Sequence, residues 1–355
     1  MKPKIVVLHD LYSKMTTKPD GSEYCWGLTR LDEGLVQILS LEPQTDLKRV
    51  ARIRDEGIEL EEISCSVSFA ELEIIPVSDD FTARSRGVID TGAMAGKKVA
   101  FIGLGSVGSQ IALHLAQSAV GQFSLLDPDK LSAANLSRHA CGLKDLARFK
   151  TKAVRDMILN RNPHARVESF EEDFLALTWS EQIERFAGAD LVIASTDSTP
   201  AQFMVNEICH HLQIPSLYVG CYERACSGEV LFVIPGRTAC FNCFMEFRQS
   251  CLADLKKKEK RVPYSDESPA EFKGEPGLAI DIAGIVAAAS AYALAMLLPD
   301  SGRGGLLDCE RNLTLLHSGS TPQGRYREIF QMPFDLLQAR VKRDQACPVC
   351  QIGLS

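Results

Sequence analysis

The segment Gly103-Leu104-Gly105-Ser106-Val107-Gly108 has the composition of a turn that binds phosphate. It lies between an apolar run and a helical pattern, so backbone N–H groups and the start of a helix can face an anion. Asp127 follows the next apolar run, where a carboxylate accepts hydrogen bonds from ribose hydroxyls. Together these residues predict a nucleotide site, and on this evidence alone a nicotinamide enzyme is the default.

Polar residues after the second apolar run favour a triphosphate over a nicotinamide cofactor. Asp129 stands two residues after Asp127, and Asn135, Arg138 and Lys150 come next. A nicotinamide fold has no use for this convergence of amide and cations. Arg138 and Lys150 can instead neutralise the β- and γ-phosphates while the α-phosphorus is attacked. A surface position is the alternative for any single cation, but the joint arrangement favours a triphosphate site.

Four of the twelve cysteines form two tight pairs, Cys240-Phe241-Asn242-Cys243 and Cys347-Pro348-Val349-Cys350. Each pair can present two thiolates to a tetrahedral Zn²⁺. The pairs lie far apart in sequence, so spacing alone leaves a redox interpretation of either pair open. A disulfide framework is not expected, because the short apolar run before His9 predicts no signal peptide and hence a cytoplasmic protein.

The bulk composition predicts a folded protein that does not bind nucleic acid. With 45% hydrophobic and 24% charged residues, the chain can bury one large core or two modest ones. A net charge of -7 argues against binding to a phosphate backbone, and the basic run 256–261 is too short to reverse this. The uncharged stretch 282–298 approaches membrane length, but its small residues favour a buried core or dimer-interface helix over a membrane span.

The elements that must position these residues follow an α/β pattern. From Lys97 the chain repeats apolar strand, turn and helix, which predicts a doubly wound Rossmann-like sheet. A domain boundary is expected between 1–90 and 91–355, with a loose linker over 80–96. The remaining expected elements can be given by residue numbers: strands at 99–102, 123–126, 189–195 and 216–220, helices at 109–118 and 148–159, and strands of a small β-rich N-terminal domain at 4–8, 58–63 and 70–75.

The order of these motifs resembles the ThiF/MoeB family, which includes the adenylation domains of ubiquitin-activating enzymes. The resemblance spans residues 84–352 and rests on the glycine turn, Leu125-Leu126-Asp127, Asn135-Leu136-Ser137-Arg138-His139, Lys150, Asn162-Pro163 and Ser195-Thr196-Asp197-Ser198. The segment 121–142 looks closest to the adenylating enzymes of bacterial ubiquitin-like conjugation operons. The fold that the resemblance implies is the ThiF/MoeB adenylation fold.

The resemblance implies roles for individual residues. Asp127 would contact the ribose, and Asn135, Arg138 and Lys150 would contact the phosphates of ATP. Asp197 would hold Mg²⁺, which offsets phosphate charge. Arg86, just before the first strand, would reach into the site of the second subunit of a homodimer, although its surroundings depart from the usual aromatic-containing signature. The four paired cysteines would hold a structural zinc that pins the C-terminal tail.

Many members of the family that this chain resembles transfer the activated acyl group to a cysteine, and this sequence departs from them at that position. The crossover stretch 273–278 contains no cysteine. Cys251 begins the crossover loop, and the basic residues of 256–258 can lower the pKa of a thiol, so it is a candidate acceptor. Cys221 and Cys226 are expected to be packing residues, because their surroundings are apolar.

Several functions remain open from the sequence. The leading hypothesis is adenylation of the C-terminal carboxylate of a ubiquitin-like protein, with an E2-like carrier as a further partner. A second is modification of a short peptide, similar to microcin C synthase, in which the N-terminal module clamps the peptide. Adenylation of a sulfur-carrier protein is third. A non-catalytic nucleotide-binding scaffold is the alternative from another class, and the retained cations and Asp197 argue against it. In all of these the chain meets no membrane and no nucleic acid.

Overall fold

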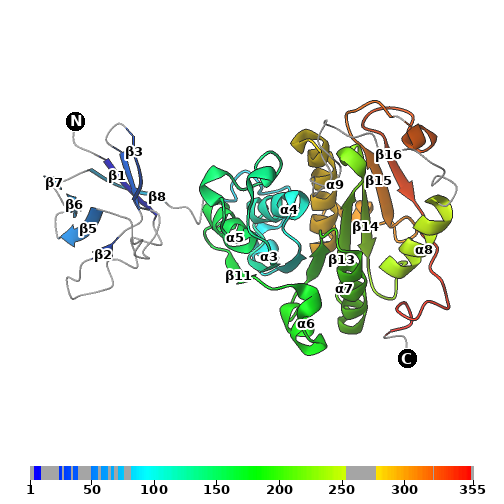
Figure 1. The fold of residues 1–355 in the computed structure, drawn as a ribbon. Helices are drawn as coiled ribbons and strands as arrows, with labels where there is room; N and C mark the ends of the chain where they lie inside the picture. The colour runs from blue at the N-terminus through cyan, green and yellow to red at the C-terminus, as the bar shows by residue number, and fades with distance from the viewer. Residues whose placement is uncertain are drawn as a thin grey trace. The chain divides into compact units, whose positions relative to one another are not determined.

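The computed structural model describes residues 81–252, 277–322 and 324–352, together with the backbones of the strands between Lys4 and Ile75. Contacts between residues divide the chain into two compact units, Met1–Arg84 and Ser85–Ser355. Figure 1 shows the fold of both units. The candidate site residues named from sequence belong to the second unit.

The first unit contains two four-stranded sheets, with strand orders β3-β4-β1-β8 and β2-β5-β6-β7. β1 pairs in parallel with β4 and β8, and the remaining pairs are antiparallel. The strands expected at 4–8, 58–63 and 70–75 are present as β1, β6 and β8, within one residue at each end. The strands are β1 Lys4–Leu8, β2 Tyr24–Cys25, β3 Leu28–Asp32, β4 Leu35–Ile38, β5 Arg49–Arg54, β6 Gly57–Glu62, β7 Cys65–Val67 and β8 Glu71–Ile75.

The second unit is built on one eight-stranded sheet with the order β11-β10-β9-β12-β13-β14-β15-β16. The five strands from β11 to β13 are parallel, and β14 to β16 continue the sheet antiparallel. The chain runs from β9 outward to β11 and then returns to the other side of β9 at β12. Ligands of doubly wound sheets bind at such a reversal, outside the carboxyl ends of the strands. The strands are β9 Lys98–Ile102, β10 Gln122–Leu126, β11 Arg166–Phe170, β12 Leu191–Ala194, β13 Ser216–Cys221, β14 Ser227–Val233, β15 Leu313–His317 and β16 Leu336–Ala339.

Helices cover both faces of this sheet, as Figure 1 shows. α4 packs against α5 and α9, while α7 packs against β12, β13 and α8. Every residue of β12 and of β14 is buried, and for the parallel strand β12 this burial explains its continuous apolar run Leu191–Ala194. The helices are α3 Thr91–Ala95, α4 Ser106–Gln117, α5 Lys150–Arg161, α6 Trp179–Arg185, α7 Thr199–Leu212, α8 Phe241–Leu252 and α9 Ala279–Leu297. The 3₁₀ turns are η1 Ala133–Asn135, η2 Leu143–Asp145, η3 Phe174–Ala176, η4 Glu223–Ala225, η5 Gly304–Leu306 and η6 Gly324–Glu328.

The structure corrects three details of the sequence analysis. α4 begins at Ser106 and not at 109, because the helix starts directly after the glycine at its N-cap. α5 begins and ends two residues later than predicted. The segment expected to be a loose linker contains α3, whose first turn is capped by Asp90 and whose Met94 is fully buried.

The apolar stretch expected as a core or interface helix forms α9. Among the described helices it is long and apolar enough, by length and composition, to span a membrane, and 56% of that window is buried within the protein. It packs on α4, β13 and β14, and Ser290 hydrogen-bonds His114 of α4 at 3.0 Å. This packing is that of a core helix of a globular domain.

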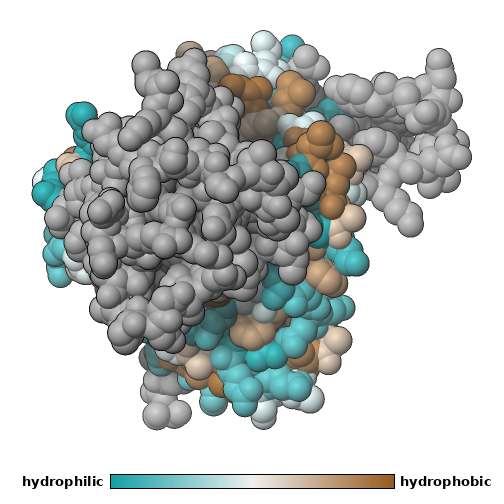
Figure 2. Space-filling view, turned by 90° about the vertical axis from the view of Figure 1, so that its left-hand side faces the viewer, coloured by the Kyte–Doolittle hydropathy of each residue, from teal (hydrophilic) through white to brown (hydrophobic). Residues whose placement is uncertain are grey.

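The surface of the second unit is mixed in character. Figure 2 shows one face, on which apolar residues gather toward the top of the view and polar residues toward the bottom. Single exposed apolar side chains are normal for a globular protein. The most exposed large ones in the described part of the chain are Val88, Leu143, Leu278, Ile280, Met332 and Phe334.

Candidate functional site

The glycine turn between β9 and α4 is pressed against the end of β12. Gly103 has φ +90°, and a Cβ there would stand 2.9 Å from the carbonyl oxygen of Ser195. A Cβ on Gly108 would stand 2.3 Å from the carbonyl oxygen of Gly103. Ser195 Oγ donates to this same oxygen at 2.7 Å. Only glycine fits these two positions, and the turn is thereby fixed at the chain reversal between β9 and β12.

The other side of the turn faces open space. Gly105 is the N-cap of α4, and a Cβ there would have no heavy atom of the described chain within 4 Å. The N-cap residue Gly105 makes no side-chain capping hydrogen bond. The first backbone N–H groups of a helix lack intrahelical acceptors and carry partial positive charge, so this end of α4 fits an anionic group.

Asp127 lies directly beneath the turn, at the end of β10. Its Oδ2 accepts the N–H of Leu104 at 2.7 Å, and its Oδ1 accepts the N–H of Asp129 at 2.9 Å. Burial raises the pKa of the Asp127 carboxyl, while Lys150 and the two N–H groups act in the opposite direction. Each carboxylate oxygen has a second lone pair, so Asp127 retains acceptor capacity for a ribose hydroxyl.

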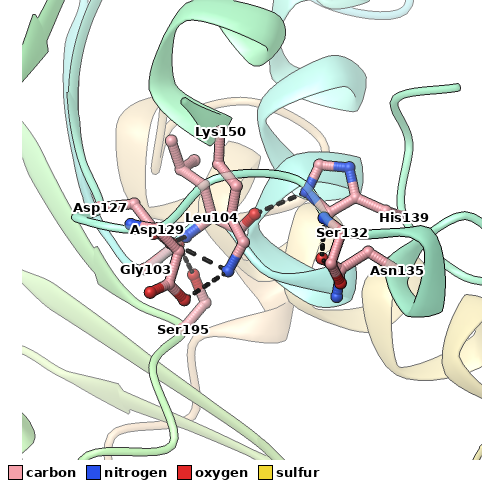
Figure 3. A network of polar contacts seen from close by, with 9 residues as sticks. All are labelled: Gly103, Leu104, Asp127, Asp129, Ser132, Asn135, His139, Lys150 and Ser195. Carbon is pink, nitrogen blue, oxygen red and sulfur yellow. Dashed lines mark hydrogen bonds and ion pairs between the residues drawn. The ribbon is translucent and has the colours of Figure 1, made fainter. Parts of the chain in front are cut away.

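Lys150 is brought to the same place by α5, which it begins. Its Nζ lies 2.7 Å from Asp129 Oδ2 and 3.8 Å from Asp127 Oδ1, and the residue is only 8% exposed. The predicted cation and two predicted acids therefore form one cluster beside the glycine turn (Figure 3). Asp129 is mostly exposed, so a phosphate can compete with it for the lysine.

Asn135 and Arg138 lie on the loop that follows Lys130. The Asn135 amide oxygen accepts the N–H and the hydroxyl of Ser132, both at 3.0 Å, so this side chain closes its own 3₁₀ turn. Arg138 is half-buried, and its carbonyl oxygen accepts Gln110 Nε2 of α4 at 3.1 Å. The structure thus brings the loop against α4, but shows no direct contact of Asn135 with the Lys150 cluster among the described residues (Figure 3).

The remaining predicted nucleotide residues lie on exposed segments. Asp197 follows β12 at the carboxyl edge of the sheet, is exposed, and has no ion pair with another described residue. Arg86 is exposed in the turn before α3. A role of Arg86 in a second subunit stays a prediction.

The candidate acceptor thiols differ in what the structure describes. Cys251 falls in the last turn of α8, but its side chain and the segment 253–276 lie outside the described residues. Cys221 is exposed, contrary to the expected packing role, because it is the last residue of β13, beyond the buried stretch of that strand. Although the residue is partly open to solvent, desolvation of its thiol by the surrounding chain raises the pKa of Cys221 to about 11, and the positive charge of Arg138 acts in the opposite direction.

Sequence reasoning missed the residues that hold the site together. His139, Ser195 and Gln110 each bond to a backbone carbonyl of the turn, the loop or the helix start. Both His139 and Ser195 stand within the motifs that carry the family resemblance. No periodicity or spacing distinguished them, because their partners are backbone groups distant in sequence.

The two cysteine pairs meet as predicted. The thiols of Cys240, Cys243, Cys347 and Cys350 are buried, and their sulfur atoms all lie within 4.8 Å of one another. We refer to these four residues as the cysteine cluster. The separations are 3.8 Å between Cys240 and Cys243, and 3.6 Å for Cys240–Cys347 and Cys243–Cys350. A tetrahedral zinc with Zn–S bonds of about 2.3 Å requires sulfur atoms about 3.8 Å apart, so the cluster fits this ion.

The surroundings of the cysteine cluster tie the C-terminal segment to the sheet. Arg343 donates to the carbonyl oxygens of Gly236 at 2.8 Å and Cys350 at 2.7 Å. The N–H of Asp344 points at Cys243 Sγ at 3.4 Å. The four cysteines also belong to the hydrophobic core cluster under α7. With four thiolate ligands no position is open for a substrate, so a metal here would be structural.

This fold and site define the class of the protein as a Rossmann-like adenylation fold. The ThiF family model matches residues 88–347, more than half of the chain, and the chain belongs to the ThiF family.

Named relatives agree with this assignment. The ubiquitin-like modifier-activating enzyme 5 of Caenorhabditis elegans is 26% identical over 239 residues, which are 65% of this chain and 55% of the relative. The enzyme of the same name from Aedes aegypti is 32% identical over 157 residues, 41% of this chain and 39% of the relative. The chain therefore spans only 39% to 55% of the length of these two relatives.

Solved structures show the same fold. E. coli MccB with MccA-N7isoASN superposes with a TM-score of 0.55 at 18% identity, covering 73% of this chain and 69% of MccB. E. coli MccB with ATP gives a TM-score of 0.53 at 19% identity, covering 73% and 68%. At this level of identity the likeness establishes the shared fold.

Proposed function

We propose that this protein is an E1-like activating enzyme that adenylates the C-terminal carboxylate of a ubiquitin-like protein. It uses ATP and Mg²⁺ and releases pyrophosphate, and the acyl group is later transferred to a thiol, hydroxyl or amine. The observation that carries this proposal is the open N-terminus of α4 beside the cluster of Asp127, Asp129 and Lys150. Membership of the ThiF family and the relatives named as ubiquitin-like modifier-activating enzymes support the substrate class.

The residues of the turn and its neighbours divide the binding of ATP. The N–H groups from Gly105 into α4 hold a phosphate, and Asp127 accepts the ribose hydroxyls. Lys150 exchanges Asp129 for a phosphate oxygen, and Arg138 and Asn135 approach the phosphates from the loop. Fixed cations at this point stabilise the charge that develops as the carboxylate oxygen displaces pyrophosphate.

Asp197 is the proposed magnesium ligand. Its carboxylate is exposed at the carboxyl edge of the sheet and makes no ion pair with a described residue, so its oxygens are available to a hard cation. Mg²⁺ supplies charge neutralisation of the phosphate oxygens when it is bound.

The proposed enzyme is a cytoplasmic homodimer in which Arg86 of each subunit reaches the site of the other. The exposure of Arg86 in the segment before α3 supports this arrangement. The cysteine cluster holds a structural Zn²⁺, supported by its sulfur separations and burial. An E2-like protein is the proposed carrier of the activated product.

The acceptor of the acyl group is either a thiol of this protein or an external nucleophile. The segment 273–278 has no cysteine, and Cys251 is the candidate that sequence favours. Cys221 is a poor nucleophile at neutral pH, because its pKa is raised to about 11. Release of the adenylate to an external nucleophile is consistent with these features.

A short peptide is the second candidate substrate. The missing cysteine in 273–278 favours it, as does the fold shared with E. coli MccB, which has been solved with MccA. Under this alternative the N-terminal unit clamps the peptide. A sulfur-carrier protein is a third candidate substrate.

Partner-dependent ATP–pyrophosphate exchange tests the proposal. Exchange should appear with a ubiquitin-like protein ending in glycine and fall by about a hundredfold or more in Asp197→Ala. Asp300→Ala, at an exposed acid after α9, is the matched control and should leave exchange unchanged. Unchanged exchange in Asp197→Ala would remove this residue from the site.

The same assay separates the alternatives. Exchange with a short peptide, and none with ubiquitin-like proteins, would select the second candidate. ATP binding without exchange for any partner would indicate a non-catalytic scaffold. A cofactor-dependent change in absorbance without pyrophosphate release would indicate a nicotinamide oxidoreductase.

A further inference from the structure

His139 bridges the two segments that form the nucleotide site. One ring nitrogen, Nε2, lies 2.7 Å from the carbonyl oxygen of Leu104 in the glycine turn. The other, Nδ1, lies 3.0 Å from the backbone nitrogen of Cys141 on the loop. The residue is 8% exposed, so both contacts are shielded from water.

These two contacts require one protonation state of the imidazole. The Cys141 N–H can only donate, so Nδ1 must be the acceptor and the proton must sit on Nε2. Nε2 then donates to the Leu104 carbonyl. An imidazolium carries protons on both nitrogens and would face the Cys141 N–H with a second donor.

Leu104 is held from both sides by this arrangement. Its carbonyl accepts His139, and its N–H donates to Asp127 Oδ2 (Figure 3). The imidazole therefore joins the loop to the residue that Asp127 fixes beneath the turn.

Two weaker contacts dock the same loop onto α4. Gln110 Nε2 donates to the carbonyl of Arg138 at 3.1 Å, and the N–H of Ala140 donates to Ser109 Oγ at 3.3 Å. Residues 138, 139 and 140 thus each contact the turn or the first turns of the helix. Only the central contact involves a side chain that titrates near neutral pH.

We infer that His139 is a positioning residue of the nucleotide site, and that its neutral imidazole holds the loop bearing Arg138 at the distance from the glycine turn that ATP requires. This inference rests on the proposed function, since it assigns Arg138 to the phosphates. Protonation of His139 releases the Cys141 contact and moves Arg138, so binding of ATP weakens as the pH falls.

Burial, more than the neighbouring charges, shifts the pKa of His139 below its ordinary value. Burial lowers the pKa of His139, and the positive charge of Lys150 acts in the same sense. The contact with the Leu104 carbonyl and the charge of Asp145 oppose them. Asp127 faces the same residue of the turn from β10. Because the folded pKa is depressed, the neutral state prevails above about pH 6.5, and its contribution is lost as the pH falls through the lower folded value.

Two substitutions separate the titration from the packing of the ring. In His139→Gln the amide N–H can donate to Leu104 and the amide oxygen can accept from Cys141, with no titration. His139→Lys keeps a donor and a positive charge but has no acceptor. KM for ATP and kcat of pyrophosphate exchange are measured for the wild type and both variants between about pH 5 and 8.

His139→Gln should retain exchange within about threefold at neutral pH, and His139→Lys should raise KM for ATP roughly tenfold at every pH. The ratio of wild-type to His139→Gln kcat/KM should fall with acid as a single protonation. A ratio independent of pH would overturn the inference while leaving the proposed function intact. Absence of exchange in the wild type at all pH values would instead overturn the proposed function.

A measurement without turnover completes the test. Nitrogen chemical shifts of the His139 ring, recorded by NMR, report which nitrogen carries the proton. A neutral ring protonated at Nε2, titrating below the ordinary histidine value, is expected. A ring protonated at Nδ1, or on both nitrogens at neutral pH, would contradict the inference even if the variants failed to fold.

Discussion

The nucleotide site and the cysteine cluster are two solutions to the same problem of bringing distant residues together. In the cysteine cluster, four thiols from segments about a hundred residues apart already stand at metal-binding separations. In the nucleotide site, the predicted ligands are engaged with one another: Lys150 with Asp129, and Asn135 with its own turn. The cysteine cluster already has the geometry of a metal site, whereas the residues of the candidate nucleotide site would have to exchange internal contacts for ligand contacts.

The difference follows from what holds each site. The four thiols of the cysteine cluster are buried in an apolar core, so their geometry is set mainly by packing. In the candidate nucleotide site the buried Lys150 pairs with the mostly exposed carboxylate of Asp129, so a phosphate oxygen can replace that carboxylate. The backbone beneath them is the rigid part: the glycine turn is fixed by Ser195, Asp127 and His139.

Removing one ligand of the cysteine cluster should have the largest effect. Cys347→Ser should lose the bound zinc and lower the free energy of unfolding by on the order of 5 kcal/mol, because metal binding is coupled to folding. Elemental analysis and thermal denaturation measure the two quantities.

Cys309→Ser is the control for that substitution, since Cys309 is a half-buried thiol outside the cluster. It should retain about one zinc per chain and near wild-type stability. If Cys347→Ser kept its zinc, the cysteine cluster would not be the preformed metal site that distinguishes it from the nucleotide site.

Two separate alanine substitutions in the glycine turn, at Gly108 and at Gly105, should differ in their effect on stability. In Gly108→Ala the new Cβ meets the Gly103 carbonyl and Ser195 Oγ, so the free energy of unfolding should fall by about 2–3 kcal/mol. Gly105→Ala meets no described atom and should change stability by less than about 1 kcal/mol.

Gly105→Ala should affect the binding of ATP, although it should hardly affect stability. This variant should bind ATP roughly tenfold more weakly, as measured by calorimetry, because the methyl group occupies the space assigned to a phosphate. Unchanged affinity in a stable Gly105→Ala protein would show that the open helix end is not the phosphate site.

The smallest effect is expected when two inactive variants are mixed so that their subunits can complement each other. Arg86→Ala and Arg138→Ala proteins should each be inactive alone, and a mixture should recover up to about a quarter of wild-type exchange if sites are shared in a twofold dimer. Pyrophosphate exchange after subunit mixing measures the recovery. No recovery, with mixed dimers demonstrated by native mass spectrometry, would place Arg86 outside the partner's site.

Much of the fold could be predicted because local patterns matched it. The apolar runs at 99–102, 123–126 and 216–220 correspond to β9, β10 and β13, shifted by one residue at most. The start of α4 was placed late, since a glycine turn and a first helical turn share residue types. α3 was missed because five residues are too few for a periodic signal.

Some properties of the candidate site could be predicted from the sequence, and others could not. Asp127, Asp129 and Lys150 were predicted as nucleotide residues, and the structure places them together. Cys221 was expected to be packed and proved exposed, because exposure depends on where a strand ends. The contacts of His139 and Ser195 depend on backbone atoms of a turn that the sequence presents only as glycines.

The sequence by itself determined which chemical groups this protein possesses and the order in which they occur: a glycine turn, acids and cations behind successive strands, and two cysteine pairs. Side-chain type and local periodicity are sufficient for that. Only the tertiary structure decided that the strand order reverses between β9 and β12, which brings Ser195 to the glycine turn. It also decided the protonation state of His139, because burial and the direction of neighbouring N–H groups arise only when distant segments pack together.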